Sequence, residues 1–309
     1  MASNTQPFRS DVIDYETFAR YLEPPRPCPL CGSTAGSVWG SRGSFRAVQC
    51  EQCTHVYMER VLSAEGLQKF YDGYIAFRLG AAAAEKLSLR AAMYAVDCKY
   101  LLSHVSSGRL LDVGCSAGEF LQHLLEHFDA YGIERDPTAV ELAHRRDGRL
   151  RDRVVMGEPH NLSPDFKPVD VLVMRGVIEH LPDPVATMRH LAKTVKPGGK
   201  LFITATPNVD CPCAEVFREK WNQFDPIQHV SHFSARTLSS LVGHFGFVLE
   251  AEYYPYLDTP YARPSEDLRI VRAAVMLDEA GRRSEMPRSP AFWGTMMTLV
   301  FRRNVTLDT

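Results

Sequence analysis

The chain lacks any apolar run approaching the ~20 residues that a membrane-spanning helix requires. Its first 20 residues are polar and contain no apolar core of the kind that defines a secretion signal. An excess of one charge is also missing, because 35 Lys and Arg against 37 Asp and Glu leave a formal net charge of −2. That balance offers no electrostatic footprint for nucleic acid. We therefore expect a cytoplasmic protein whose partners are neither membranes nor nucleic acids.

The dinucleotide-binding pattern G-x-G-x-x-G is also missing from the most glycine-rich strand end. Residues 110–120 read L-L-D-V-G-C-S-A-G-E-F, an apolar strand that ends on Asp112 and passes through two glycines into a helix. A dinucleotide site would need glycines at 114, 116 and 119, and only the first is present. An acidic residue followed by G-x-G-x-G fits instead, with Gly114, Gly118 and Ser116 as a small substitute. Glycines let a backbone approach a ligand closely, and a helix start offers N–H groups to an anion, so the loop is predicted to bind a nucleotide cofactor.

Four of the eight cysteines form two C-x-x-C pairs with eighteen residues between them. Each pair makes a tight knuckle, and two knuckles complete a tetrahedral zinc site. The predicted ligands are Cys28, Cys31, Cys50 and Cys53. Four sulfur ligands leave no open coordination position, so the metal is expected to be structural. A module this short has too little core to fold without it.

Short apolar strands alternate with amphipathic helices from residue 109 onward, a pattern typical of an α/β fold with a mostly parallel sheet. The expected strands are 109–114, 129–134, 153–156, 169–174, 199–205, 247–254 and 296–302, and the expected helices lie near 118–127, 137–146, 184–194 and 237–244.

Three domains follow from this pattern. A zinc-binding module is expected over 1–60, a helical linker or lid over 61–105, and the α/β domain over 106–309. The stretch 255–291 is too long for a hairpin loop. It is either a lid with a helix near 266–280 or partly disordered.

A possible catalytic pair follows the fourth strand of the α/β domain. Residues 174–184 read M-R-G-V-I-E-H-L-P-D-P, and the carboxyl ends of strands line the ligand crevice of an open α/β sheet. Histidine titrates near neutrality, so His180 is a candidate general base, with Glu179 orienting it or acting itself. The alternative is that either residue only caps the local turn. Arg175 either binds an anionic acceptor or pairs with Asp183 or Glu179.

A second group of polar and aromatic residues follows the fifth strand. Thr206-Pro207-Asn208 precedes the run W-N-Q-F-D-P-I-Q-H-V-S-H-F-S over 221–234. We expect Trp221, His229 and His232 to overhang the pocket of the molecule acted on, since such side chains suit a polyhydroxylated or aromatic ligand. The alternative is that His229 hydrogen-bonds the backbone and shapes its own loop.

Together these motifs resemble class I S-adenosylmethionine (SAM) dependent methyltransferases of a bacterial type that carries an N-terminal four-cysteine zinc module. The likeness extends over C-x-x-C-G, the cofactor loop, E-H-L-P-D-P and the block at 221–234, and thus over most of the chain. It implies a Rossmann-like fold with seven strands, helices on both faces, SAM and structural zinc. Relatives of this type act in sugar, antibiotic and cell-surface glycan pathways, so the implied acceptor is a sugar, a glycan precursor or another natural product.

SAM has four recognisable parts, and each suits a different group. Its carboxylate suits the backbone N–H groups of the glycine loop, its amino group suits Asp112, and its ribose suits Glu134, which ends the second strand twenty residues after Gly114. The resemblance places Glu158 near the adenine, and Cys115 is expected to make contact through its backbone. The full set of expected cofactor residues is Asp112, Gly114, Cys115, Ser116, Gly118, Glu134, Glu158 and Met174.

The site of methylation stays open at this point. One branch of the resembling type C-methylates nucleotide-linked deoxysugars with an adjacent Glu-His pair, which points Glu179 and His180 to deprotonation. O- and N-methylation are equally open. An RNA methyltransferase with a zinc module is disfavoured by the near-neutral charge and by T-P-N where an N-P-P-Y loop would stand. A non-catalytic SAM-fold partner protein is disfavoured by the intact cofactor loop and Glu134.

Overall fold

The computed structural model describes residues 13–78, 83–163 and 165–304. Its larger sheet has seven strands in the order β10-β11-β8-β7-β4-β5-β6. The strands are β4 (Gly108–Val113), β5 (Phe128–Glu134), β6 (Val154–Met156), β7 (Val169–Arg175), β8 (Val195–Pro207), β10 (Phe247–Tyr253) and β11 (Met296–Arg303). Strands β4 to β8 pair in parallel, whereas β11 runs antiparallel to both β8 and β10. The predicted mostly parallel, seven-stranded α/β fold is confirmed.

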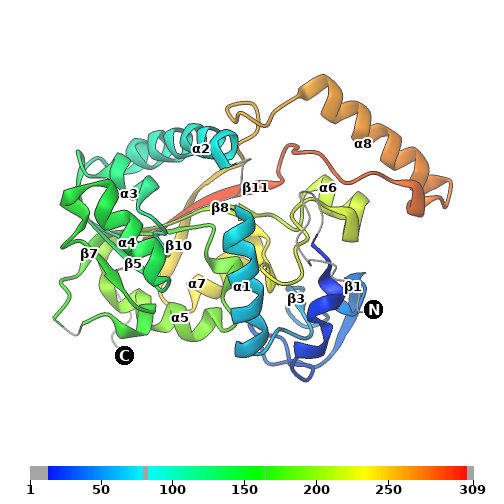
Figure 1. Cartoon of the computed structure of the whole chain (residues 1–309), viewed down its shortest axis with the longest axis horizontal. Helices are drawn as coiled ribbons and strands as arrows, with labels where there is room; N and C mark the ends of the chain where they lie inside the picture. Colours follow the sequence, from blue (N-terminus) through cyan, green and yellow to red (C-terminus); the bar gives the residue numbers. More distant parts are fainter. Residues whose placement is uncertain (1–12, 79–82, 164, 305–309) are drawn as a thin grey trace.

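Helices cover both faces of this sheet (Figure 1). On one face pack α2 (Ala83–His104), α3 (Glu119–Leu124) and α4 (Pro137–Arg146), which bury Leu101, Leu121 and Ala143 in one apolar cluster. On the other face, α5 (Pro184–Leu191) and α7 (Ala235–Gly243) bury Met188, Leu191, Leu238 and Leu241. Between them, β4, β7 and the second half of β8 are largely buried, and their sequences read as mostly apolar runs.

The N-terminal region forms a second, antiparallel sheet of four strands. Its order is β1 (Gly36–Arg42), β2 (Phe45–Cys50), β3 (Val56–Met58) and β9 (Ser231–His232). The fourth strand therefore comes from the chain beyond β8, although the other three lie within the first 60 residues. The predicted division at residue 60 stays a prediction, but the two regions share this sheet.

A second apolar core joins the N-terminal sheet to the rest of the chain. Phe45 and Val56 pack there with Trp221 and with residues of α6 (Pro212–Phe217) and α8 (Pro264–Glu279). Helix α8 reaches away from the large sheet (Figure 1). The helix expected near 266–280 is thus confirmed, and its role as a lid stays a prediction.

The remaining elements are short or peripheral. Helix α1 (Ala64–Arg78) precedes α2, and 3-10 turns occur at Tyr15–Tyr21, Gly148–Leu150, Pro159–Asn161, Ile178–His180, Ala192–Thr194, Arg218–Lys220 and Arg283–Glu285. Across residues 13–78, 83–163 and 165–304, none of the helices combines the length and apolarity needed to cross a bilayer.

Candidate functional site

The glycine loop leaves β4 at the carboxyl edge of the large sheet and leads into α3. Gly114 and Gly118 have φ of +70° and +72°, a region that L side chains rarely adopt. A Cβ at Gly114 would lie 2.7 Å from Val177 Cγ2, and one at Gly118 would lie 2.7 Å from Leu150 Cδ1. Both positions therefore require glycine.

Glu134 fastens this loop to the end of β5. Its Oε2 accepts a hydrogen bond from the Ser116 N–H at 2.9 Å, and its Oε1 accepts one from the Asp136 N–H at 2.9 Å. Each carboxylate oxygen has a second lone pair, so Glu134 can also accept from the two hydroxyls of a ribose. The structure thus brings together the predicted loop and the predicted ribose-binding carboxylate.

Asp112 lies beneath the loop as a buried carboxylate. Burial raises its pKa to about 8, opposed by the positive charge of Arg175 and assisted by the negative charge of Glu134. Its Oδ1 has no hydrogen-bond partner within the described part of the chain. An unsatisfied buried acceptor is costly, and an ammonium group would satisfy it. The unpartnered carboxylate oxygen of Asp112 is therefore an acceptor that suits the amino group of SAM.

Three other predicted cofactor residues differ in what their side chains can reach. Cys115 packs over Gly132, where a Cβ would lie 2.5 Å from the Cys115 sulfur, and burial raises its thiol pKa well above the ordinary value. Met174 is fully buried in the core, so a contact with the cofactor can involve only its backbone. Glu158 lies at the surface, 3.9 Å from the guanidinium of Arg135.

Glu179, His180 and His229 meet beyond the carboxyl end of β7, and we call these three residues the acceptor centre. Each offers one ligand atom, and the three atoms lie within 4.8 Å of one another. The two imidazole rings are 4.9 Å apart between centroids and roughly perpendicular. Glu179 is buried, and its Oε2 accepts from Thr206 Oγ1 at 3.4 Å. Two predicted blocks far apart in sequence thus form one cluster.

Backbone carbonyls fix the tautomer of both histidines. His180 Nδ1 lies 2.7 Å from the Gln228 carbonyl oxygen, and His229 Nδ1 lies 2.7 Å from that of Gln223. Because a carbonyl oxygen can only accept, each Nδ1 carries the hydrogen, and Nε2 of the neutral ring keeps its lone pair. The prediction that His229 hydrogen-bonds the backbone is confirmed, and that bond leaves its other nitrogen available.

Burial sets the charge of this centre. Desolvation lowers the pKa of His180 and raises that of Glu179, while each partner opposes the shift of the other. His180 is therefore neutral at neutral pH, as a proton acceptor must be. A neutral imidazole whose Nδ1 is held by a carbonyl is also suited to ligate a divalent metal ion, so the geometry permits either role.

The structure contradicts the expected pairing of Arg175 with Asp183 or Glu179, and contact with an anionic acceptor stays a prediction. The Arg175 Nε donates to Asp97 Oδ2 at 2.8 Å, and its guanidinium lies 4.4 Å from the ring centre of Tyr94. It therefore pairs with neither Asp183 nor Glu179. Asp97, almost fully buried on α2, also accepts from Thr204 Oγ1 at 3.0 Å. No sequence motif singles out Asp97, which lies 78 residues from its partner.

Trp221 and His232 do not overhang an open pocket as predicted. Trp221 is fully buried in the core that joins the two sheets, and His232 lies in β9 with its ring against both Trp39 and Phe224. The cause is the pairing of β9 with β3, which draws this segment under the N-terminal sheet. Of the three predicted substrate contacts in the 221–234 block, only His229 reaches the acceptor centre.

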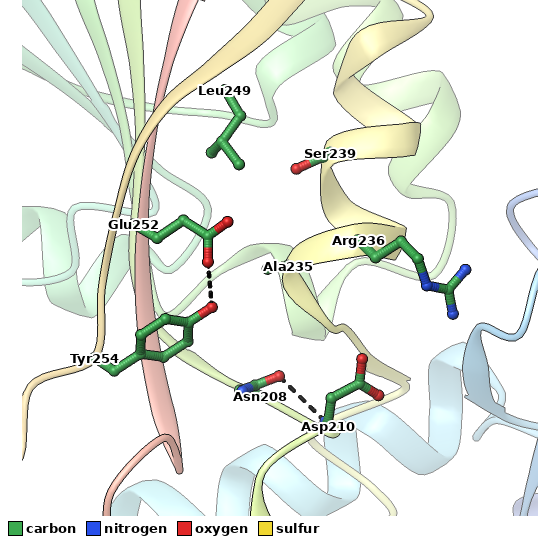
Figure 2. A pocket seen from close by; sticks show the side chains of 8 residues that line it. All are labelled: Asn208, Asp210, Ala235, Arg236, Ser239, Leu249, Glu252 and Tyr254. Atoms are coloured by element: carbon green, nitrogen blue, oxygen red, sulfur yellow. Dashed lines mark hydrogen bonds between the residues drawn. The ribbon is translucent and has the colours of Figure 1, made fainter.

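An open pocket of about 420 Å³ lies beside α7, near the ends of β8 and β10 (Figure 2). Its lining residues are Asn208, Asp210, Ala235, Arg236, Ser239, Leu249, Glu252 and Tyr254. Figure 2 shows Arg236 directed away from Glu252 and Tyr254, which hydrogen-bond each other. This pocket contains neither the cofactor loop nor the acceptor centre.

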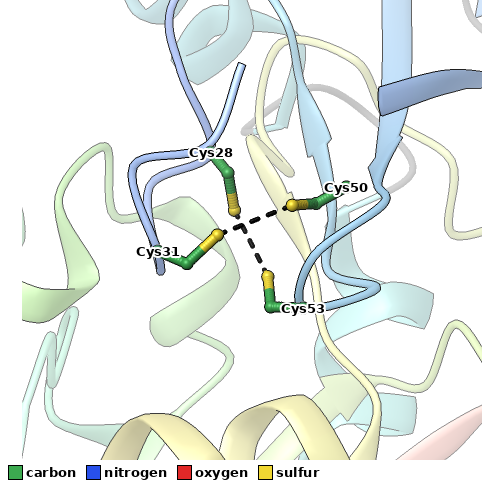
Figure 3. A group of neighbouring side chains, drawn as sticks. All are labelled: Cys28, Cys31, Cys50 and Cys53. Atoms are coloured by element: carbon green, nitrogen blue, oxygen red, sulfur yellow. Dashed lines mark hydrogen bonds between the residues drawn. The ribbon is translucent and has the colours of Figure 1, made fainter. Parts of the chain in front are cut away.

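The four predicted zinc ligands converge at the edge of the N-terminal sheet (Figure 3). The sulfur atoms of Cys28 and Cys53 lie 3.5 Å apart, as do those of Cys31 and Cys50. Tetrahedral zinc with bonds of about 2.3 Å requires sulfur separations of about 3.8 Å, so the group fits the ion after a small expansion.

Comparison with known proteins agrees with this geometry. A family model described as a methyltransferase domain matches residues 85–252, more than half of the chain. The chain belongs to this methyltransferase family. The matched region contains the glycine loop, Glu134 and all three residues of the acceptor centre, so the chain carries a SAM-dependent methyltransferase domain.

Individual relatives match the methyltransferase only in part. The ubiquinone biosynthesis O-methyltransferase of Coxiella burnetii is 27% identical over 114 residues, which cover 35% of this chain and 49% of that protein. Its counterpart in Aeromonas salmonicida is 29% identical over 102 residues, covering 31% and 42%. The chain thus spans about half the length of the curated relatives it matches.

A solved structure supports the fold of the methyltransferase. The crystal structure of a SAM-dependent methyltransferase, a possible histamine N-methyltransferase, from Thermotoga maritima superposes with a TM-score of 0.51 at 17% identity. The superposition covers 77% of this chain and 98% of that one. At this identity the likeness concerns the fold alone.

Proposed function

We propose that this chain transfers the methyl group of SAM to a small-molecule acceptor whose nucleophilic atom lies at the acceptor centre. The observation that carries the proposal is that His180 and His229 both have Nδ1 held by a carbonyl, with Glu179 as a third acceptor beside them. Each of these three residues can accept a hydrogen bond, and they lie close together. An O–H or N–H group of the substrate is a donor that would satisfy them.

The chain's own residues divide the work between two neighbouring sites. Asp112 accepts from the amino group of SAM, Glu134 accepts from its ribose, and the N–H groups of the glycine loop hold its carboxylate. Bound SAM supplies an electrophilic methyl group for in-line displacement. His180 Nε2 takes the proton that the acceptor loses, and the buried carboxylate of Glu179 stabilises the resulting imidazolium. His229 orients the acceptor.

The class of acceptor rests on weaker support than the reaction. The resemblance to zinc-bearing bacterial methyltransferases favours a sugar, a glycan precursor or another natural product, and the matched relatives include ubiquinone biosynthesis O-methyltransferases. A structural zinc ion at the four cysteines belongs to the proposal, supported by their spacing and by the convergence of their sulfur atoms.

The test compares His180→Asn with His190→Asn, a matched change on the exposed side of α5. Isotope-labelled SAM and a small-molecule cell extract serve as substrates, and calorimetry measures SAM affinity. We expect turnover in His180→Asn to fall by roughly 10²–10⁴-fold, as for loss of a general base, with unchanged SAM affinity. Because the pKa of His180 is lowered, turnover of the native protein should decline on acidification only below about pH 6.5.

Several outcomes would overturn parts of the proposal. Equal turnover in both variants would remove His180 from proton transfer. Label appearing in an RNA fraction would replace the small-molecule acceptor, and failure of the native chain to bind SAM would leave a non-catalytic partner protein. Loss of turnover on chelation, with zinc still bound to the four cysteines, would indicate a divalent cation in the acceptor centre.

A further inference from the structure

Arg26 precedes the first zinc-knuckle cysteine by two residues and joins three separate segments of the chain. Its Nε donates to the Met58 carbonyl oxygen at 3.0 Å. Its Nη1 donates to Pro182 at 2.8 Å, and its Nη2 donates to Val230 at 2.9 Å, both again at the carbonyl oxygen. The last two partners lie 156 and 204 residues away in sequence.

The partners of Arg26 are adjacent to the two histidines of the acceptor centre. Pro182 follows His180 by two residues, and Val230 immediately follows His229. The gap that Arg26 bridges is also crossed by the His180 ring, whose Nδ1 bonds the Gln228 carbonyl oxygen. The guanidinium and the imidazole therefore tie the same two loops together.

The third partner anchors this bridge to the N-terminal sheet. Met58 ends β3, and its N–H donates to the Val230 carbonyl oxygen at 3.0 Å, beside the bond from Arg26. Strand β3 then continues the attachment by pairing Tyr57 with Ser231 and Val56 with His232. The loop that carries His229 is thus an extension of the four-cysteine module.

Arginine is suited to this position in a way that lysine is not. Its planar fork presents five N–H donors in fixed directions, and three carbonyls in different directions use that geometry here. Hydrogen bonds from a charged donor are stronger than those between neutral groups, and loss of the guanidinium would remove three of them at once. Lysine offers a single point of charge and can reach only part of the set.

We propose that Arg26 is a positioning residue of the acceptor centre. It holds the loops of His180 and His229 in register with the N-terminal module, so that both Nδ1 atoms stay on their carbonyl partners and both Nε2 atoms stay free. The proposal rests on the proposed function for its catalytic meaning. In this proposal, the four-cysteine module helps to set the geometry of the acceptor centre.

The experiment uses the full chain with Arg26→Ala, Arg26→Lys and the control Arg46→Ala. Arg46 lies on β2 of the same module, and its exposed guanidinium bonds only the Glu59 side chain among the contacts of the described residues. Long-range proton–nitrogen NMR spectra of ¹⁵N-histidine protein report which ring nitrogen carries the hydrogen, independently of any acceptor. Signals are assigned with His180→Asn and His229→Asn, and zinc content and SAM affinity are measured in parallel.

In Arg26→Ala we expect both tautomers of His180 and His229 to be populated instead of Nδ1–H alone. Turnover of labelled SAM with the extract should fall at least tenfold, while SAM affinity and zinc content remain within twofold. Arg26→Lys should restore part of the Nδ1–H signal, and Arg46→Ala should match the native chain. The native tautomers in Arg26→Ala would overturn the proposal, even if turnover had fallen.

The readouts separate this proposal from the proposed function. If His180→Asn retains turnover but Arg26→Ala shifts the tautomers, the positioning role stands and the base assignment fails. If His180→Asn loses turnover but Arg26→Ala keeps the native histidine tautomers, the proposed function stands and the positioning role fails. If Arg26→Ala loses zinc as well, the residue supports the module itself, and the positioning proposal is overturned.

Discussion

The cofactor cradle and the acceptor centre lie at the same edge of one sheet, yet they are assembled over very different distances along the chain. The cradle needs only the segment from Asp112 to Glu134, and its tie between Ser116 and Glu134 spans 18 residues. The acceptor centre joins Glu179 and His180 to His229, and Arg26 reaches across 204 residues to support it. One site is local, and the other depends on the whole fold.

This difference suggests which part of the protein sets specificity. A local cradle of glycines and strand-end carboxylates can bind the same cofactor whatever surrounds it. If the four-cysteine module holds the acceptor centre as proposed, a change in that module also changes the centre. We therefore expect the N-terminal sheet to influence the acceptor side strongly and the cofactor side little, and three experiments test this division.

Metal removal should have the largest effect, and it should divide the two sites. Structural zinc contributes on the order of 10–16 kcal/mol in isolated zinc-finger peptides, and this module has little core of its own. Chelation, or Cys50→Ser, should open the N-terminal sheet to proteolysis and abolish turnover. Calorimetry should still detect SAM binding, because hydrogen bonds from within the segment between Asp112 and Glu134 hold the cofactor loop.

The control for metal removal is zinc restored in excess after the chelator has been removed. Recovery of protection and of turnover together would tie the acceptor centre to the module. Loss of SAM binding in parallel with proteolytic opening would contradict the division, since it would show that the cradle also requires the N-terminal sheet.

Glu134→Ala should weaken the cofactor side and spare the acceptor side, which is the reverse of metal removal. Its effect should be smaller than that of metal removal. The substitution removes the acceptor for ribose hydroxyls and releases the Ser116 and Asp136 N–H groups. Hydrogen bonds to charged groups contribute about 1.5–3 kcal/mol, so SAM affinity should fall by roughly ten- to a hundredfold. The histidine tautomers at the acceptor centre should not change.

Glu158→Ala is the matched control for that experiment. Glu158 follows the third strand of the same edge and lies at the surface near Arg135. Its replacement should weaken SAM binding less than Glu134→Ala does. Equal losses in the two variants would mean that the ribose contact has been assigned to the wrong carboxylate.

The same distinction between local and distant contacts explains what the sequence could predict. The sheet, the glycine loop and Glu134 depend on periodicity and on neighbouring strand ends, and these are visible in a single sequence. The burial of Trp221 and His232 depends on a two-residue strand that joins a sheet built from the first 60 residues. No local pattern distinguishes such a strand from a loop.

The sequence does not reveal the partners of Arg175 and Arg26, and the reason is related. The sequence predicts an ion pair as one of two roles for Arg175, but its actual partner Asp97 lies on α2, in a segment without a recognisable motif. Arg26 precedes a recognisable cysteine knuckle, and its three carbonyl partners leave no trace in the sequence because every residue has a carbonyl. Backbone acceptors are therefore the contacts that sequence reasoning misses most readily.

The smallest expected effect is on how the free energy of unfolding depends on pH, to which the acceptor side and the cofactor side each contribute one buried titratable group. Burial lowers the pKa of His232 well below its ordinary value, and the neighbouring imidazoles of His229 and His55 act in the same direction. In the unfolded chain, His232 binds a proton as the pH falls below about 6.5, whereas in the folded chain it stays neutral. Protonation therefore favours the unfolded chain, and the free energy of unfolding decreases as the pH falls below that value. Asp112 acts with the opposite sign, because its pKa is raised to about 8 in the fold.

His232→Phe should remove the acid sensitivity that His232 contributes. Phenylalanine suits the aromatic surroundings of Trp39 and Phe224, and it cannot be protonated. Urea unfolding at pH 7.5 and pH 5.5 should show a loss of stability on acidification that is about 1 kcal/mol smaller in the variant than in the native chain. His190→Asn, at an exposed position, should keep the native difference. Identical differences in all three proteins would show that His232 is protonated within the fold, and that the acceptor side is open to water where the structure buries it.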